Sequence, residues 1–217
     1  MPQTLPIIAV LANDRNGHSP EPSIRAIEQA GGGVRVIASI VSDTGALGSV
    51  GGLLLPDYNS GEDAIFLQAA LAMDMPVLAT GGGMHALNRH FGGGNALDAP
   101  AHFPEDEAEP LQHQIYLSPG SKMAAIIGSA GMFRVNSRHH EGIREPQRAE
   151  RLMTIAYQLD DGVIEGLESK EHSWVIGVQF QPERSEEVPA SFNNLFLGLV
   201  ERAQDFIENN DTRSTSR

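Results

Sequence analysis

Two junctions between a predicted strand and a turn lie where an enzyme would present catalytic side chains. The first, residues 76–85, is an apolar run that enters three glycines at 81–83, and the second, residues 177–183, is an apolar run that enters Gln181. Acyl transfer through a side-chain nucleophile also needs a base that accepts the nucleophile's proton and a group that orients this base. Glycine offers no nucleophile, and a glutamine amide cannot act as a base near neutral pH. The sequence therefore predicts a catalytic framework that lacks its reaction.

Two hydroxyl side chains near these junctions are alternative nucleophiles. Thr80 directly precedes Gly81, but neighbouring side chains on a strand face opposite sides, so we expect Thr80 to point into the core. Ser137 ends a predicted strand and has His139 two residues later, which would place a base nearby. A serine near a histidine is common by chance, so the favoured interpretation of Ser137 is structural.

The three glycines at 81–83 precede a predicted helix and resemble a phosphate-binding loop only superficially. Backbone N–H groups at a helix N-terminus attract anions, which keeps Gly82 as a candidate for binding a small ligand. The spacing matches neither the dinucleotide-binding fingerprint nor the P-loop, because no Lys-Ser/Thr pair follows. Glycine also fits a strained turn because it lacks a Cβ. Relaxation of the turn backbone is the favoured explanation.

The elements that must position these residues alternate between strand and helix in the first half of the chain. Apolar and β-branched runs predict strands at 7–12, 34–39, 52–55 and 76–80. Helical periodicity and glycine terminators predict helices at 23–30, 62–73 and 84–91. This alternation indicates right-handed βαβ units and a parallel sheet that is covered on both faces.

The second half of the chain has a different pattern. Residues 99–110 are acidic and proline-containing, which predicts an exposed loop, and short strands are expected at 113–117, 132–137, 154–159, 163–167 and 174–180. The sequence Asp160-Asp161-Gly162 predicts a tight hairpin. A closing amphipathic helix is expected at 191–207. We expect one domain over residues 1–208 and a disordered tail over 209–217.

Composition and charge disfavour several classes of partner. The chain has 217 residues, a net charge of −13 and no cysteine. Such a negative surface repels nucleic acid and anionic membranes, and the lack of cysteine removes disulfides, thiolate metal sites and a cysteine nucleophile. No apolar run approaches about 20 residues and no secretory signal is visible at the N-terminus. These features predict a cytoplasmic globular protein.

Five segments, in order along nearly the whole chain, resemble a known family. They are Gly52-Leu53-Leu54-Leu55-Pro56; Pro76-Val77-Leu78 with Gly83-Met84 and Leu87-Asn88; Val135-Asn136-Ser137 with His139-His140; Asp161-Gly162-Val163-Ile164-Glu165; and Gly177-Val178-Gln179-Phe180 with Pro182-Glu183. Together they resemble the class I glutamine amidotransferase-like superfamily and, within it, the gamma-glutamyl-gamma-aminobutyrate hydrolases. The resemblance implies an α/β fold: a flavodoxin-like, mostly parallel sheet flanked by helices and extended by an antiparallel ribbon.

The chain departs from this family's pattern at the residues that carry its chemistry. Where the family has Cys-Arg-Gly-Met-Gln, this chain has Gly81 at the nucleophile's position and His85 at that of the glutamine. Where the family ends its last strand with His-Pro-Glu, Gln181 replaces the histidine and only Glu183 matches the triad. The family's Gly-Gly after the third strand is also missing. Asp57 and Tyr58 stand there instead, as candidates for contacting a ligand.

A metal site would have to be built from histidines. His85 lies one helical turn beyond Gly81, and the resemblance places His139 and His140 near the same pocket; with Glu141 or Glu183 they could form a nitrogen–oxygen site. No pair of histidines has ligand spacing on one predicted helix face. The sequence therefore predicts no metal and no cofactor, with these three histidines as the candidates that remain.

The function predicted from the sequence is that of a pseudoenzyme of a cysteine amidohydrolase family. In this hypothesis the chain binds a small amide or carboxylate ligand, or a protein partner, in the former active site, and a homodimer is possible. One alternative is an active hydrolase of gamma-glutamyl-type amides with a non-standard, metal-assisted site. Another is a structural or regulatory subunit.

Overall fold

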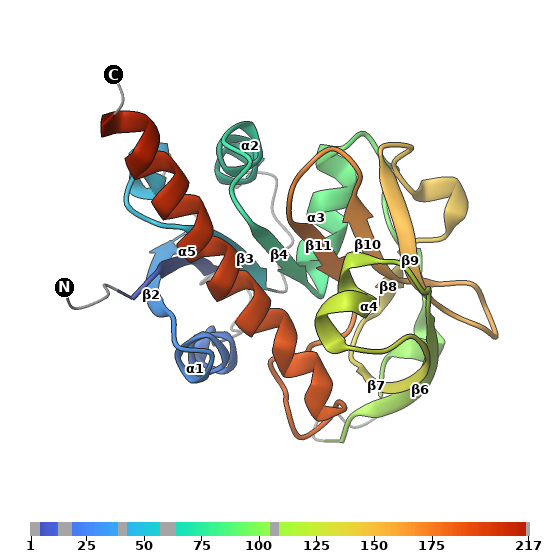
Figure 1. Ribbon diagram of the computed structural model, residues 1–217. Helices are drawn as coiled ribbons and strands as arrows, with labels where there is room; N and C mark the ends of the chain where they lie inside the picture. Colours follow the sequence, from blue (N-terminus) through green and yellow to red (C-terminus); the bar gives the residue numbers. More distant parts are fainter. Residues whose placement is uncertain (1–4, 13–18, 39–42, 57–63, 105–108, 216–217) are drawn as a thin grey trace.

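The computed structural model describes residues 5–12, 19–38, 43–56, 64–104 and 109–215. In this part of the chain, nine strands form one sheet in the order β2-β1-β3-β4-β11-β10-β9-β6-β7 (Figure 1). A separate two-stranded sheet pairs β5 with β8. The predicted ligand contacts Asp57 and Tyr58 lie outside the described residues.

Five strands of the large sheet are parallel to one another. They are β2 (Gly33–Ala38), β1 (Ile7–Ala12), β3 (Gly52–Pro56), β4 (Val77–Thr80) and β11 (Val175–Val178). Their side chains alternate between two apolar clusters: Ile8 and Val10 join one, whereas Ala9 and Leu11 join the other. A strand buried on both faces has no polar side, which is why these segments read as continuous apolar runs.

The other four strands of the large sheet form an antiparallel ribbon. They are β10 (Ile164–Ser169), β9 (Leu152–Gln158), β6 (Leu111–Leu117) and β7 (Gly131–Ser137). The turn between β9 and β10 contains Gly162 at φ +71°, and Asp161 Oδ1 accepts a hydrogen bond from the Val163 N–H. This confirms the predicted hairpin, and the architecture confirms the predicted α/β class with a parallel sheet extended by an antiparallel ribbon.

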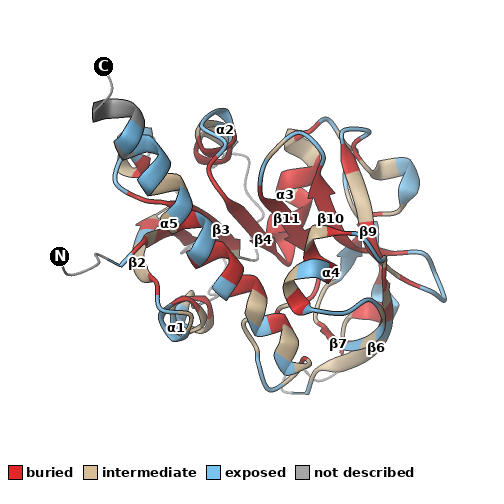
Figure 2. Cartoon of the chain, viewed as in Figure 1, coloured by how far each residue is buried: buried red, intermediate tan, exposed pale blue. Residues whose placement is uncertain are grey.

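Helices cover both faces of the sheet, as the buried strands between them show in Figure 2. On one face, α1 (Glu21–Gln29), α4 (Lys122–Ile127) and α5 (Asn194–Thr215) contribute Ile27, Met123 and Leu199 to the first apolar cluster. On the other face, α2 (Ala64–Ala72) and α3 (Gly82–His90) contribute Phe66 and Leu87 to the second. Within the described ranges, every helix is too short or too polar to cross a lipid bilayer.

Several element boundaries differ from those expected. Helix α1 starts at Glu21 rather than residue 23 because Pro22 is compatible with the first helical turn. The expected loop 99–110 includes the short η4 helix (Pro100–His102), which directly follows β5 (Leu97–Asp98). No sequence pattern predicted α4, β5 or β8 (Glu141–Gly142). The remaining short helices are η2 (Thr44–Leu47), η5 (Glu145–Gln147) and η6 (Ala190–Asn193).

Helix α5 continues to Thr215, whereas the sequence predicts a disordered tail from residue 209. Extending an existing helix avoids the cost of nucleating a new one, so polar residues without apolar anchors can continue it. The Thr212 hydroxyl also donates to the backbone carbonyl groups of Glu208 and Asn209.

Candidate functional site

The turn between β4 and α3, here called the elbow, is the position at which the family resemblance places a nucleophile, and its backbone is in an unusual conformation. Gly81 has φ +54° and ψ −127°, its N–H donates to Val178 O at 2.9 Å, and its carbonyl accepts from the Met84 N–H at 3.0 Å. A residue with a Cβ adopts such angles only with strain. Glycine removes that strain and, with it, the side chain that would attack a substrate.

A second glycine of the elbow is required by close packing. A Cβ on Gly83 would lie 2.1 Å from Leu55 O, so the first turn of α3 packs directly on the backbone of β3. This contact explains why position 83 is glycine, and the explanation requires no bound ligand. Small-anion binding at Gly82 remains a prediction.

Gln181, at the position of the family's base, belongs to a network of structural hydrogen bonds. Its Oε1 accepts from Arg184 Nε at 2.6 Å. Its backbone N–H donates to Asn136 Oδ1 at 2.9 Å, and its carbonyl accepts from Asn136 Nδ2 at 3.0 Å. The amide is therefore held by an arginine, in a role that requires no proton transfer.

Glu183, the position that matches the family's triad, contacts the residue just before the elbow. Thr80 is fully buried, as predicted, and its hydroxyl donates to Glu183 Oε1 at 3.3 Å. The carboxylate thus lies beside the β4–α3 turn. Glu183, which the family resemblance matches to the acidic residue of the triad, and the β4–α3 turn are therefore neighbours.

His85 pairs with Gln179, which directly follows strand β11. Its Nε2 lies 2.5 Å from Gln179 Oε1, and both residues are buried. Since the amide oxygen only accepts, His85 Nε2 carries the proton in this contact. Among the described residues, the histidines that gather as possible metal ligands do not include His85.

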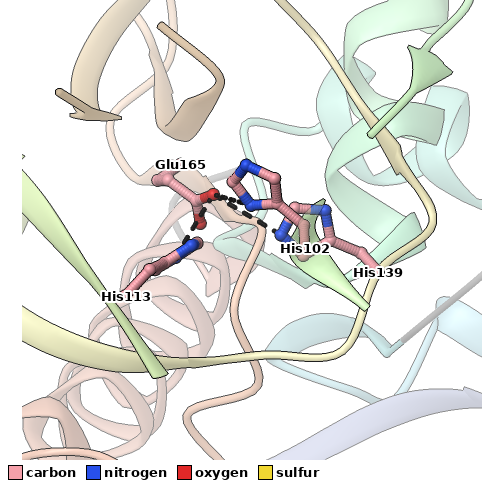
Figure 3. A group of neighbouring side chains, drawn as sticks. All are labelled: His102, His113, His139 and Glu165. Carbon is pink, nitrogen blue, oxygen red and sulfur yellow. Dashed lines mark ion pairs between the residues drawn. The ribbon is translucent and has the colours of Figure 1, made fainter. Parts of the chain in front are cut away.

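Three histidines and one carboxylate meet at a second location, here called the histidine–glutamate cluster: His102, His113, His139 and Glu165 (Figure 3). They come from η4, β6, the segment after β7, and β10. One ligand atom from each lies within 4.8 Å of the others. Glu165 Oε1 lies 3.5 Å from His113 Nε2, 3.5 Å from His139 Nε2 and 3.7 Å from His102 Nδ1.

The cluster is deeply buried, and this shifts its proton affinities. Burial raises the pKa of Glu165, but the imidazoles of His113 and His139 lower it further, to about 2. Burial lowers the pKa of His139, but Glu165 outweighs this effect and the net pKa is raised. Burial and the neighbouring His139 lower the pKa of His102. Glu165 is therefore a carboxylate surrounded by imidazoles at neutral pH.

The remaining candidates from the sequence do not form the site expected of them. Of the three histidines considered as metal ligands, only His139 belongs to the cluster. His140 is exposed and its ring stacks on Phe103, with centroids 3.4 Å apart. Ser137 does not pair with His139, because its hydroxyl donates to the backbone carbonyl of His102 at 2.7 Å.

Sequence reasoning missed His102, His113 and Glu165 as members of one group. One signal was available: Glu165 interrupts the apolar run 163–167, and a carboxylate inside a buried strand requires a partner. Nothing local identified that partner, because the four residues are far apart in the sequence.

Comparison with known proteins identifies the family of this chain. Residues 60–183 match the sequence profile of the peptidase C26 family. The gamma-glutamyl-gamma-aminobutyrate hydrolase of Escherichia coli is 25% identical over 166 residues, which cover 70% of this chain and 64% of that protein. The chain thus spans less than two thirds of the length of the first curated relatives it matches.

Two solved structures share the architecture. A Thermoplasma acidophilum protein described as a GMP synthase component has a TM-score of 0.74 at 16% identity, covering 95% of this chain and 99% of its own. The glutaminase domain of Trypanosoma brucei CTP synthase, solved with bound acivicin, has a TM-score of 0.74 at 15% identity, covering 92% and 94%. At these identities the likeness concerns the fold alone.

Proposed function

We propose that this chain, which belongs to the peptidase C26 family, does not carry out the cysteine-dependent hydrolysis that the family resemblance implies. In this proposal the elbow binds a small amide- or carboxylate-bearing ligand and does not cleave it. The E. coli relative is named for hydrolysis of a gamma-glutamyl amide, which makes gamma-glutamyl compounds the first ligands to test.

The observation that carries this proposal is Gly81 at φ +54° on the elbow. The backbone that presents a nucleophile is kept, and the nucleophile is missing. Members of a catalytic triad act as one unit, so that loss of the nucleophile alone lowers kcat by about a millionfold in a well-studied serine protease. Gln181 adds a second loss, since its amide is hydrogen-bonded to Arg184 and cannot accept a proton near neutral pH.

Buried polar groups next to the elbow support a binding role. The Thr80–Glu183 and His85–Gln179 contacts place a hydroxyl, a carboxylate, an imidazole and an amide near the β4–α3 turn. Such a mixture of donors and acceptors could recognise an amide or carboxylate group that exchanged for these contacts.

Two measurements on the purified protein test this proposal. We expect no release of gamma-aminobutyrate from gamma-glutamyl-gamma-aminobutyrate above the rate without protein. We also expect that this compound, glutamine or glutamate raises the melting temperature, because a ligand that binds only the folded state stabilises it. Turnover that disappears in a Glu183→Ala variant would contradict the proposal, and so would a complete lack of binding by all three compounds.

A metal-assisted hydrolase is the second candidate, and the histidine–glutamate cluster is the observation that favours it. A catalytic metal needs a coordination position open to substrate. The facing atoms of His113, His139 and Glu165 are buried from solvent, which argues for a closed site instead. Hydrolysis that stops on chelation and returns with added metal would support a metal-assisted hydrolase over an elbow that binds a ligand without cleaving it.

A further inference from the structure

The histidine–glutamate cluster holds polar atoms that face one another without hydrogen bonds. Both carboxylate oxygens of Glu165, His113 Nε2 and His139 Nε2 are buried and receive or donate no hydrogen bond among the described residues. The N–O distances of 3.5 Å are too long for well-formed hydrogen bonds. Burying a carboxylate is costly unless a positive charge compensates it. The cluster therefore requires either extra protons or a cation.

In two of the imidazoles, the ring nitrogen that faces away from Glu165, here called the outer nitrogen, has a hydrogen-bond partner. The partner shows which nitrogen carries the proton. His139 Nδ1 lies 2.9 Å from Glu141 O, and a backbone carbonyl only accepts, so this nitrogen is protonated. His102 Nε2 lies 3.2 Å from Asp161 Oδ2, and this carboxylate is also paired with Arg144. His102 Nε2 therefore donates to it. In their neutral forms both rings direct a lone pair from the other nitrogen toward Glu165.

The nearby hydroxyl does not satisfy the inward nitrogen of His102. Ser137 Oγ lies 3.4 Å from His102 Nδ1, but its single hydrogen is donated to His102 O at 2.7 Å. Ligating histidines typically donate their outer N–H to a carboxylate or a backbone carbonyl, which fixes the ring. His102 and His139 show one example of each partner.

The distances from Glu165 Oε1 to the three facing nitrogens also fit a metal ion. Bonds of about 2.0–2.2 Å in a tetrahedral arrangement place neighbouring ligand atoms about 3.3–3.6 Å apart. Glu165 Oε1 lies 3.5, 3.5 and 3.7 Å from the three facing nitrogens. Three imidazoles and one carboxylate suit zinc and neighbouring transition metals, whereas Mg²⁺ and Ca²⁺ prefer ligand sets made of oxygen.

We propose that His102, His113, His139 and Glu165 bind one divalent transition-metal ion, zinc by the donor set, in a closed structural site. Four protein ligands complete a tetrahedral shell, and their burial leaves no position for substrate. The ion joins η4 to strands β6 and β10 and to the segment after β7, elements that are far apart in the sequence. This inference does not depend on the function of the elbow.

Metal content of protein made without a polyhistidine tag tests the proposal directly. After expression with zinc and gel filtration, we expect about one zinc ion per chain in the wild type and about 0.1 or fewer in Glu165→Gln and His113→Gln, because loss of one ligand weakens a four-ligand site strongly. His140→Asn is the matched control: it removes the neighbouring histidine outside the cluster, and it should retain the wild-type content.

Substitution with Co²⁺ reads the geometry independently of the variants. The metal-free wild type with added Co²⁺ should develop the visible absorption bands of a tetrahedral ion, and added zinc should abolish them. Wild-type protein that retains no zinc and shows no such bands would overturn the proposal and assign the cluster to a protonated ion-pair network. Equal zinc retention by Glu165→Gln would overturn it as well. If a variant does not fold, the wild-type zinc content and the Co²⁺ spectrum still decide.

Discussion

The elbow and the histidine–glutamate cluster are linked by one residue and differ in whether backbone or side chains define them. Gln179 donates its backbone N–H to Glu165 O at 3.0 Å, and its side chain contacts His85 on α3. At the elbow the backbone has a positive φ at Gly81, and the positions that the family resemblance assigns to the nucleophile and the base hold Gly81 and Gln181. In the cluster the side chains carry the chemistry, because three imidazoles face one carboxylate, and no motif of the family predicted that. Within one sheet, the elbow is thus defined by its backbone and the cluster by its side chains.

This difference has a physical basis. The elbow backbone is stabilised by contacts that no reaction requires, such as the packing of Gly83 on Leu55 O. None of them depends on a nucleophile at position 81. The cluster depends on the side chains themselves, because Glu165 is buried and needs its charge compensated. We therefore expect the elbow to respond to changes that move its backbone, and the cluster to respond to loss of its side chains.

The largest expected effect is on the elbow backbone. Gly83→Ala would place a Cβ 2.1 Å from Leu55 O, where backbone atoms must move. We expect a loss of about 3 kcal/mol in the free energy of unfolding, measured by urea denaturation. Gly94→Ala is the control, since its nearest neighbour would lie at 3.5 Å. Equal stability of the two variants would mean that the elbow does not pack as described.

The next effect concerns the cluster. If the cluster binds zinc only in the folded state, free zinc at roughly a hundredfold excess over its dissociation constant adds about 2.7 kcal/mol to the free energy of unfolding. We expect this rise in the wild type and in His140→Asn, and its loss in Glu165→Gln. Titration of unfolding midpoints against buffered zinc measures it. A wild-type unfolding midpoint that does not change with zinc would contradict zinc binding by the cluster.

A smaller loss of stability is expected at the former base. Asn136→Ala removes the side chain that bonds both backbone groups of Gln181. Since these groups lose their partners, we expect a cost of about 2 kcal/mol by urea denaturation. Asn194→Ala, which removes a single bond to Ile126 O at 3.3 Å, should cost less. A neutral Asn136→Ala would show that Gln181 is not held by this pair.

The smallest effect is expected on catalysis. Gly81→Cys combined with Gln181→His replaces the two missing triad groups, yet we expect no more than about a tenfold gain over background hydrolysis of gamma-glutamyl-gamma-aminobutyrate. The chain also lacks the Gly-Gly after the third strand, which the family resemblance associates with stabilising the oxyanion. The release of gamma-aminobutyrate measures this. Activity approaching that of an ordinary hydrolase would show that side chains alone separate this chain from active enzymes.

The amino-acid sequence by itself determined the framework of the molecule. Apolar runs and glycine terminators located the parallel strands and their helices, and the family resemblance predicted that Gly81 and Gln181 stand at the positions of a nucleophile and a base. These features are local, because periodicity and turn preferences act over a few residues. Only the tertiary structure decided that His85 pairs with Gln179, that His140 stacks on Phe103, and that His102, His113, His139 and Glu165 meet. Strand register and the path of the chain bring these residues together, and neither is encoded in the spacing of the residues along the sequence.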